Sequence, residues 1–291
     1  MEQQQRYDNL KLGERGAMVS IIAYIFLSAL KLMIGSLSGS EALRADGLNN
    51  ATDIVASIAV LIGLKLAQKP ADKDHPYGHW KSETIASLIA SFIMMAVGLE
   101  VLINAVTTVF RGSEQSPDLI SIWTGLFCAV VMYFVYRYNK SLANRTKSQA
   151  VMAAAKDNLS DALVSIGTMV GIVGSQFNLP WLDPVTAVLV GLIICKTAWD
   201  IFREASHHLS DGFDEKTIQE FREKVQRVEG VEAVKELRAR SYGSNAVVDV
   251  VLSIKRDLKF REAHDIATNV ETELKKSSEV IEVHVHYEPS K

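Results

Sequence analysis

Two pairs of oxygen-bearing side chains stand at helical spacing inside segments that are otherwise apolar. Asp46 and Asn50 are four positions apart, and so are Asp157 and Asp161. Residues i and i+4 share one face of an α-helix, so each pair directs its oxygens to one spot. Ionisable groups at membrane depth are costly and mark ion or proton pathways. The two pairs therefore predict a binding site for a transported divalent cation.

The predicted ligand set holds three carboxylates, one amide and no imidazole. Oxygen ligands suit Mn²⁺, Mg²⁺ or Ca²⁺, whereas imidazole favours Zn²⁺. Crowded carboxylates without a metal repel one another and are desolvated, which favours the binding of protons. Metal and protons then compete for one site, which is the basis of an antiport that moves metal out and protons in.

The alternative for these residues is that they only form hydrogen bonds between helices. That alternative explains three carboxylates at one depth poorly. Asp53 lies seven positions after Asp46, near the same helix face but about two turns away. Its role is open between a proton relay or access group and a helix–helix hydrogen bond, and we favour the hydrogen bond.

Apolar segments of about 20 residues, the length that crosses a bilayer, occupy the first two thirds of the 291-residue chain. Six spans are predicted, at 17–37, 45–66, 83–108, 119–138, 151–174 and 182–204. Lys and Arg gather in the N-terminal flank and in the connections after the second and fourth spans. The positive-inside rule then places both termini in the cytoplasm. The polar start of the chain argues against a cleaved signal peptide.

The C-terminal part reads as a soluble domain with normal charge. Helical periodicity over 214–230 precedes two strands joined by a turn at Gly243, then a second amphipathic helix and a final alternating strand. We predict a membrane domain at 1–211 and a cytoplasmic α+β domain of αββαβ order, ferredoxin-like or metallochaperone-like, at 212–291. The net charge of −3 gives no indication of nucleic-acid binding, and Cys128 and Cys195 form no CxxC pair.

These features resemble the cation diffusion facilitator family of proton-coupled divalent-metal exporters. The resemblance covers nearly the whole chain, and its most specific parts are the strings PADKDHPYGHWKSE and SQAVMAAAKDNLSD. It implies no enzyme and no cofactor, but a homodimer in the cytoplasmic membrane, surrounded by lipid, that exports a divalent metal in exchange for protons. It places the transport ligands on spans two and five. The Asn–Asp arrangement is similar to the manganese branch, with zinc, iron or cobalt export as alternatives.

The resemblance also implies a role for the loop between spans two and three. Asp72, His75 and His79 are candidates for a second metal site, because some family members bind zinc there. The alternative is a family loop that holds no metal. Lys81 is expected to pair with Asp211 and to hold the dimer and soluble domains in register, or else to act only as a positive-inside anchor.

A regulatory metal site in the cytoplasmic domain is a further expectation from the resemblance. Its candidate ligands are Asp249, His264, His286 and Glu288, while Lys235 stands where zinc-type relatives have a histidine. The alternative is a solvated histidine face.

Three functions from other classes compete with an exporter. An intramembrane aspartyl protease would carry a GxGD motif, which the sequence lacks. A divalent-cation channel would have weak successive sites rather than one compact cluster. A membrane-anchored metal sensor would leave the buried carboxylates without a role.

Overall fold

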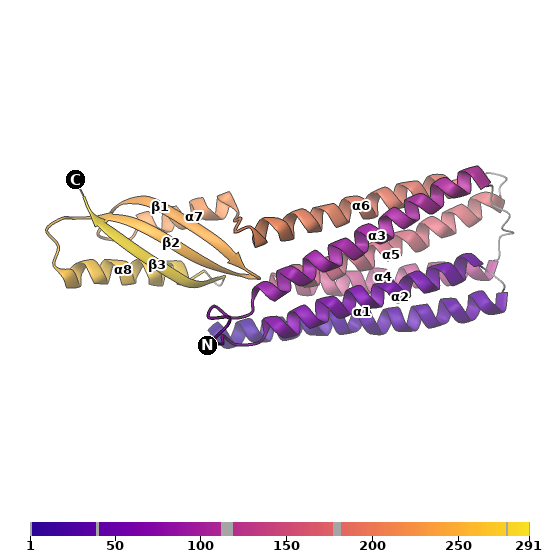
Figure 1. Cartoon of the computed structure of the whole chain (residues 1–291), viewed down its shortest axis with the longest axis horizontal. Helices are drawn as coiled ribbons and strands as arrows, with labels where there is room; N and C mark the ends of the chain where they lie inside the picture. The colour runs from indigo at the N-terminus through magenta and orange to yellow at the C-terminus, as the bar shows by residue number, and fades with distance from the viewer. Residues whose placement is uncertain (1, 39–40, 112–118, 177–181, 278, 291) are drawn as a thin grey trace. The chain divides into compact units, whose positions relative to one another are not determined.

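The computed structural model describes residues 2–38, 41–111, 119–176, 182–277 and 279–290 (Figure 1). Its contacts divide the chain into two units, Gln3–Ala205 and Ser206–Lys291. The first unit is helical, and the second is a small α+β domain. The boundary predicted between residues 211 and 212 falls shortly after this division.

Six long helices occupy the places of the six predicted spans. They are α1 (Glu2–Ser38), α2 (Glu41–Ala67), α3 (Lys81–Arg111), α4 (Leu119–Thr146), α5 (Gln149–Gln176) and α6 (Leu182–Leu209). Helices α1 and α4 are longer than predicted, because their polar flanks contain residues that favour a helix. Over the described residues, α1, α2, α3 and α6 are long and apolar enough to cross a membrane, a criterion that α4 and α5 do not meet. Residues 39–40, 112–118 and 177–181 of the connections lie outside the described residues.

The helical unit exposes many large apolar side chains and buries several polar ones. Ile22, Phe92 and Trp123 are more than half exposed, whereas Ser57, Ser87 and Asn139 are buried. This distribution is the reverse of a water-soluble core and is what a lipid surrounding requires. The first unit is therefore a multi-pass membrane bundle.

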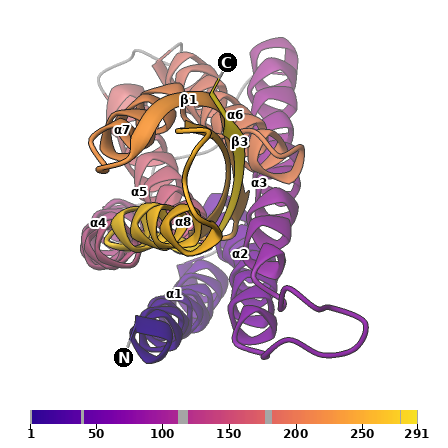
Figure 2. The ribbon, with the colours of Figure 1, turned by 90° about the vertical axis from the view of Figure 1, so that its left-hand side faces the viewer.

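The second unit has the predicted αββαβ order: α7 (Glu215–Gln226), β1 (Val231–Tyr242), β2 (Asn245–Ile254), α8 (Phe260–Lys275) and β3 (Val280–Pro289). The sheet order is β1-β2-β3, with β1 antiparallel and β3 parallel to β2. Both helices lie on the same side of the sheet (Figure 2). One apolar core joins them to it, and includes Phe221, Val248, Val270 and Val283.

Local sequence explains where these elements begin and turn. Asp214 caps α7, since its side chain accepts a hydrogen bond from the backbone N–H of Thr217 at 2.9 Å. Gly243, between β1 and β2, has a φ of 62°, which a residue without Cβ adopts without strain. The predicted strands and turn are thus confirmed.

Helices α2 and α3 approach closely at Gly63. A Cβ atom added at Gly63 would lie 2.2 Å from the Cβ of Ala86 and 2.9 Å from the backbone oxygen of Ser82. The two helices can pack this tightly only because position 63 has no side chain. Gly125 on α4 is different, because the nearest atom to its added Cβ is a backbone oxygen at 3.7 Å.

We expect Gly63→Ala to destabilise the membrane unit by about 1–3 kcal/mol, the usual effect of overpacking a well-packed contact. The measurement is thermal unfolding of the detergent-purified protein. Gly125→Ala is the matched control and should unfold at the wild-type temperature or slightly above it. Equal melting temperatures for Gly63→Ala and Gly125→Ala would contradict the close contact.

Candidate metal centre

Three carboxylates converge inside the helical bundle. One oxygen from each of Asp53, Asp157 and Asp161 lies within 4.8 Å of the other two. Asp53 and Asp161 are buried, and Asp157 is partly buried. Negative charges this close in a low-dielectric interior repel strongly unless protons or a cation neutralise them. The carboxylate cluster is thus suited to hold a divalent cation, protons, or each in turn.

The hydroxyl of Tyr24 on α1 lies against this carboxylate cluster. It is 3.0 Å from Oδ2 of Asp157 and also forms a short hydrogen bond to Oδ2 of Asp161. The side chain of Tyr24 is fully buried. Because the hydroxyl has a single proton, it donates to one of the two carboxylates at a time. Tyr24 therefore ties α1 to the two aspartates of α5.

A buried polar network supports Tyr24 from behind. The side-chain amide of Asn158 donates to the Tyr24 hydroxyl at 3.1 Å, and its Oδ1 accepts from Ser20 at 3.0 Å and from Asn139 at 2.9 Å. These residues come from α1, α4 and α5. Satisfied buried networks of this kind fix side-chain orientation.

The structure places the two predicted residues of α2 differently from the two of α5. Asp157 and Asp161 lie together as the spacing predicted. Asp46 instead forms an ion pair with Lys31 of α1, Oδ2 to Nζ 2.7 Å. Asn50 Oδ1 accepts from the same ammonium at 2.6 Å, and its amide nitrogen is 3.3 Å from Oδ2 of Asp53. Asp53, whose role the sequence left open between a proton relay or access group and a favoured helix–helix hydrogen bond, is the α2 carboxylate in the cluster.

Sequence reasoning missed Tyr24 and Lys31. A signal for Lys31 was present, because it is an ionisable residue within the predicted span 17–37. For Tyr24 the signal was weaker: Ser20 and Tyr24 share a face at i, i+4 spacing.

The loop between α2 and α3 brings its three predicted residues together. Asp72, His75 and His79 each offer a ligand atom within 4.8 Å of the others. Oδ1 of Asp72 is 3.2 Å from Nδ1 of His75, and its Oδ2 is 3.5 Å from Nε2 of His79. The backbone N–H of His75, which donates to Asp72, lowers the pKa of that exposed carboxyl. Metal binding at this group stays a prediction.

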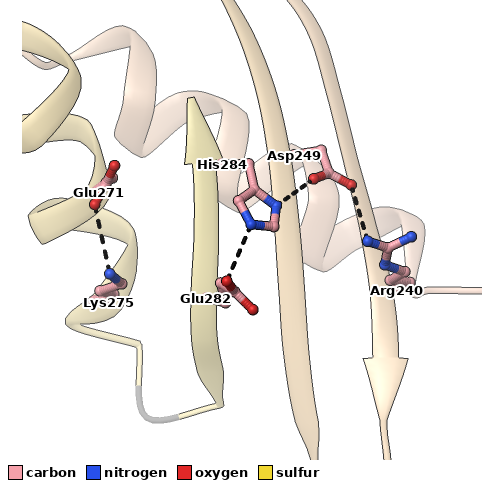
Figure 3. Close-up of polar contacts among 6 residues, drawn as sticks. All are labelled: Arg240, Asp249, Glu271, Lys275, Glu282 and His284. Carbon is pink, nitrogen blue, oxygen red and sulfur yellow. Dashed lines mark hydrogen bonds and ion pairs between the residues drawn. The ribbon is translucent and has the colours of Figure 1, made fainter. Parts of the chain in front are cut away.

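The cytoplasmic candidates are divided between the two faces of the sheet. Asp249 accepts from Nδ1 of His284, not from one of the predicted histidines, at 2.9 Å (Figure 3). Nε2 of His286 lies 3.9 Å from Oε1 of Glu288. The other carboxylate oxygen of Glu288 forms an ion pair with Lys235. Alternation along β2 and β3 turns these side chains away from the core face covered by α8, and α8 carries His264. Within the described ranges, the four predicted residues do not form a metal-sized group.

Acidic neighbours favour the charged form of His284. The hydrogen bond with Asp249 raises the pKa of its imidazole, and a contact with Oε1 of Glu282 at 3.1 Å adds to the effect. The hydrogen bond from Lys235 lowers the pKa of Glu288.

Lys81 is the first residue of α3 in the helical unit, whereas Asp211 follows α6 in the other unit. Asp211 has a φ of 62°, a left-handed conformation that Asp tolerates, just beyond the end of α6. The predicted pairing of Lys81 with Asp211 stays a prediction.

Comparisons with known proteins cover almost the whole chain. Residues 17–210 match the cation efflux transmembrane domain, and residues 213–290 match the cytoplasmic domain of cation efflux proteins. The chain is 57% identical to the manganese efflux system protein MneS of Bacillus subtilis, over 98% of each chain. It is 31% identical to the manganese efflux system protein MneP of the same organism, over 96% of this chain and 97% of that protein.

We expect Tyr24→Phe to destabilise the metal-free protein by about 1–3 kcal/mol, because buried carboxylates lose a hydrogen-bond donor. If the cluster binds Mn²⁺ in place of the Tyr24 hydroxyl, added Mn²⁺ should stabilise Tyr24→Phe more than it stabilises wild type. Thermal unfolding with and without Mn²⁺ measures both effects. Tyr133→Phe, on the exposed surface of α4, is the control. Equal destabilisation with and without Mn²⁺ would mean that the hydroxyl acts independently of the cation.

The pKa of His284 should depend on Asp249. Charged His284 stabilises the domain fully below the ordinary histidine pKa of about 6.5, and this is lost as pH rises through the raised value. Diethyl pyrocarbonate modifies neutral imidazole, so modification of His284, followed by mass spectrometry, should need a higher pH than 6.5. Asp249→Asn should lower that midpoint, while Glu271→Gln, in the separate Glu271–Lys275 pair, should not. An unchanged midpoint in Asp249→Asn would rule out the assigned cause.

Proposed function

Because the chain belongs to the cation efflux family, we propose that it exports Mn²⁺ from the cytoplasm in exchange for protons. The matched families and the named relatives are transport proteins, so the chain is a metal-cation transporter and not an enzyme. Zn²⁺, Fe²⁺ or Co²⁺ export is the alternative within the same family.

The observation that carries this proposal is the convergence of Asp53, Asp157 and Asp161. We assign these three carboxylates as transport ligands. Asn49 precedes Asp53 by four residues, as Asp157 precedes Asp161, so its amide is on the same face of α2 and is the proposed fourth ligand. In this assignment Asn49 and Asp53 replace the predicted Asn50 and Asp46, which interact with Lys31.

The ligand chemistry favours manganese. Carboxylate and amide oxygens suit a hard divalent cation, and the set has no imidazole or thiolate that would favour zinc or copper. The identities with MneS and MneP support the same metal. Water or backbone carbonyls would complete the coordination, since manganese takes more than four ligands.

The same carboxylates supply the coupling to protons. Three mutually repelling buried carboxylates need positive charge when the cation leaves, and protons provide it at the least steric cost. Tyr24 adds a donor that stabilises the metal-free form. In this proposal, protons bind to the same carboxylates that the metal leaves, so metal release and proton uptake occur together.

We place the protein in the cytoplasmic membrane, with both termini in the cytoplasm, as a homodimer. The Lys- and Arg-rich connections support the orientation. The match of residues 213–290 to the cytoplasmic domain of cation efflux proteins supports both the orientation and the assembly.

The test is transport in proteoliposomes that enclose a pH-sensitive dye. Mn²⁺ should drive proton movement more strongly than Zn²⁺, Co²⁺, Fe²⁺ or Cd²⁺. Asp53→Ala and Asp157→Ala should each abolish it, because each removes a ligand and a buried charge.

Glu100→Gln is the matched control, since it neutralises an exposed carboxylate of α3 in the same unit and should transport normally. Transport that survives Asp53→Ala would refute the assigned site. A stronger response to Zn²⁺ than to Mn²⁺ would keep the exchanger but overturn the argument from oxygen ligands.

A further inference from the structure

Lys31 is a charged residue in the interior of the membrane bundle. Only 1% of its surface is exposed. Its ammonium lies 2.7 Å from Oδ2 of Asp46 and 2.6 Å from Oδ1 of Asn50. Burying an ammonium costs several kcal/mol before its partners offset that cost. Among the transport ligands proposed above, none is an ion-pair partner of Lys31, so the transport chemistry described so far does not explain this charge.

The Lys31–Asp46 ion pair lies between the carboxylate cluster and one end of the bundle. Asp46 precedes Asp53 by seven residues, about 10 Å along α2. It therefore lies toward the end at which α1 finishes and α2 begins (Figure 1). The helices are tightly packed there, because Ser28 donates to the backbone oxygen of Gly47 at 2.7 Å and a Cβ at Gly47 would meet Lys31 at 3.1 Å.

A continuous chain of contacts joins the ion pair to the cluster. Asp46 binds Lys31, Lys31 donates to Asn50, and the amide of Asn50 is 3.3 Å from Oδ2 of Asp53. The side chain of Asn50 therefore links the Lys31 ammonium to the carboxylate of Asp53.

We propose that Lys31 is a tethered cation that closes the α1–α2 end of the transport pathway while the carboxylate cluster is free of metal. This inference rests on the proposed exchange function. The ammonium occupies the oxygens of Asp46 and Asn50, which would otherwise offer a passing cation a second binding position. It is covalently held, so it blocks this position without being transported.

Binding of a divalent cation weakens this closure in two ways. The cation competes with the Asn50 amide for the carboxylate of Asp53, which weakens the contact that orients Asn50 toward Lys31. The cation also repels the ammonium across a low-dielectric interior. Once Lys31 withdraws, Asp46 and Asn50 supply oxygen ligands on the way out. Opening of this end is therefore linked to loading of the site, which prevents the flow of protons without metal.

The first test is proton leakage in metal-free proteoliposomes with an internal pH dye. Lys31→Met keeps the length of the side chain but removes the charge, and it should raise the leak about tenfold. Such a rise corresponds to an open state that grows from about 1% to about 10% of molecules. Asp46→Asn should raise the leak in the same direction. Lys31→Arg, which keeps an ion pair, should leak less than Lys31→Met, and Lys196→Met on the exposed side of α6 should match wild type.

The second test uses the native thiol of Cys128 as a reporter, in a Cys195→Ser background. Cys128 is fully buried and belongs to a cluster of buried residues that includes Tyr24 and Leu27 of α1, the helix that carries Lys31. A water-soluble maleimide should label Cys128 about tenfold faster in Lys31→Met and in Asp46→Asn than in the protein with an intact Lys31–Asp46 ion pair. Addition of Mn²⁺ should also accelerate the labelling of Cys128 in the protein with the intact ion pair.

Proton leakage and Cys128 labelling together distinguish an error in the proposed closure by Lys31 from an error in the proposed exchange function. Wild-type leak and wild-type labelling in folded Lys31→Met or folded Asp46→Asn would overturn the proposal. If Lys31→Met does not fold, Asp46→Asn decides, because its amide still accepts from Lys31 and preserves the local shape. Absence of Mn²⁺-driven proton movement in wild type would instead refute the exchange function. The labelling rates of Cys128 in the variants and in wild type would still test the closure by Lys31.

Discussion

Mutual repulsion among Asp53, Asp157 and Asp161 is the constraint on which the membrane unit depends. One oxygen from each carboxylate lies within 4.8 Å of the other two, so their negative charges repel strongly in the low-dielectric interior of the bundle. A bound cation or protons would offset this repulsion. In the proposed function, a divalent cation and protons compete for this one cluster, and that competition is the basis of the exchange.

Side chains around the cluster hold its carboxylates in place despite this repulsion. Tyr24 and the network of Ser20, Asn139 and Asn158 hold the α5 carboxylates in place from α1 and α4. Several buried side chains are small, which lets the helices approach, and many large apolar side chains are exposed. The hydrophobic effect, which organises a soluble core, contributes little between helices in lipid, so buried polar contacts and close packing hold the bundle together.

The comparison of sequence with structure shows which information a helical pattern contains. Spacing of four residues identified Asp157 and Asp161, and periodicity located the six helices and the αββαβ order. On α2 the spacing pointed to Asp46 and Asn50, whereas Asp53, about two turns after Asp46, is the α2 carboxylate that lies in the cluster. Which aspartate of α2 lies at the depth of Asp157 depends on how α2 and α5 cross, and on the presence of Lys31 beside Asp46. In the C-terminal domain, the pairing of Asp249 with His284 follows from the parallel register of β2 and β3, which strand alternation alone does not specify.

The missing side chain at Gly63 has a mechanical consequence. The close approach of α2 to α3 at Gly63 leaves no room for a side chain between them, and such tight packing favours movement of the two helices together. Helices α4 and α5 also pack against each other extensively and form a second pair. Asp53 belongs to the α2–α3 pair, and Asp157 and Asp161 belong to the α4–α5 pair, so the three carboxylates meet between two helix pairs. In the proposed function, a cation held by all three would fix the two pairs in one relative position, and its release would let them take another.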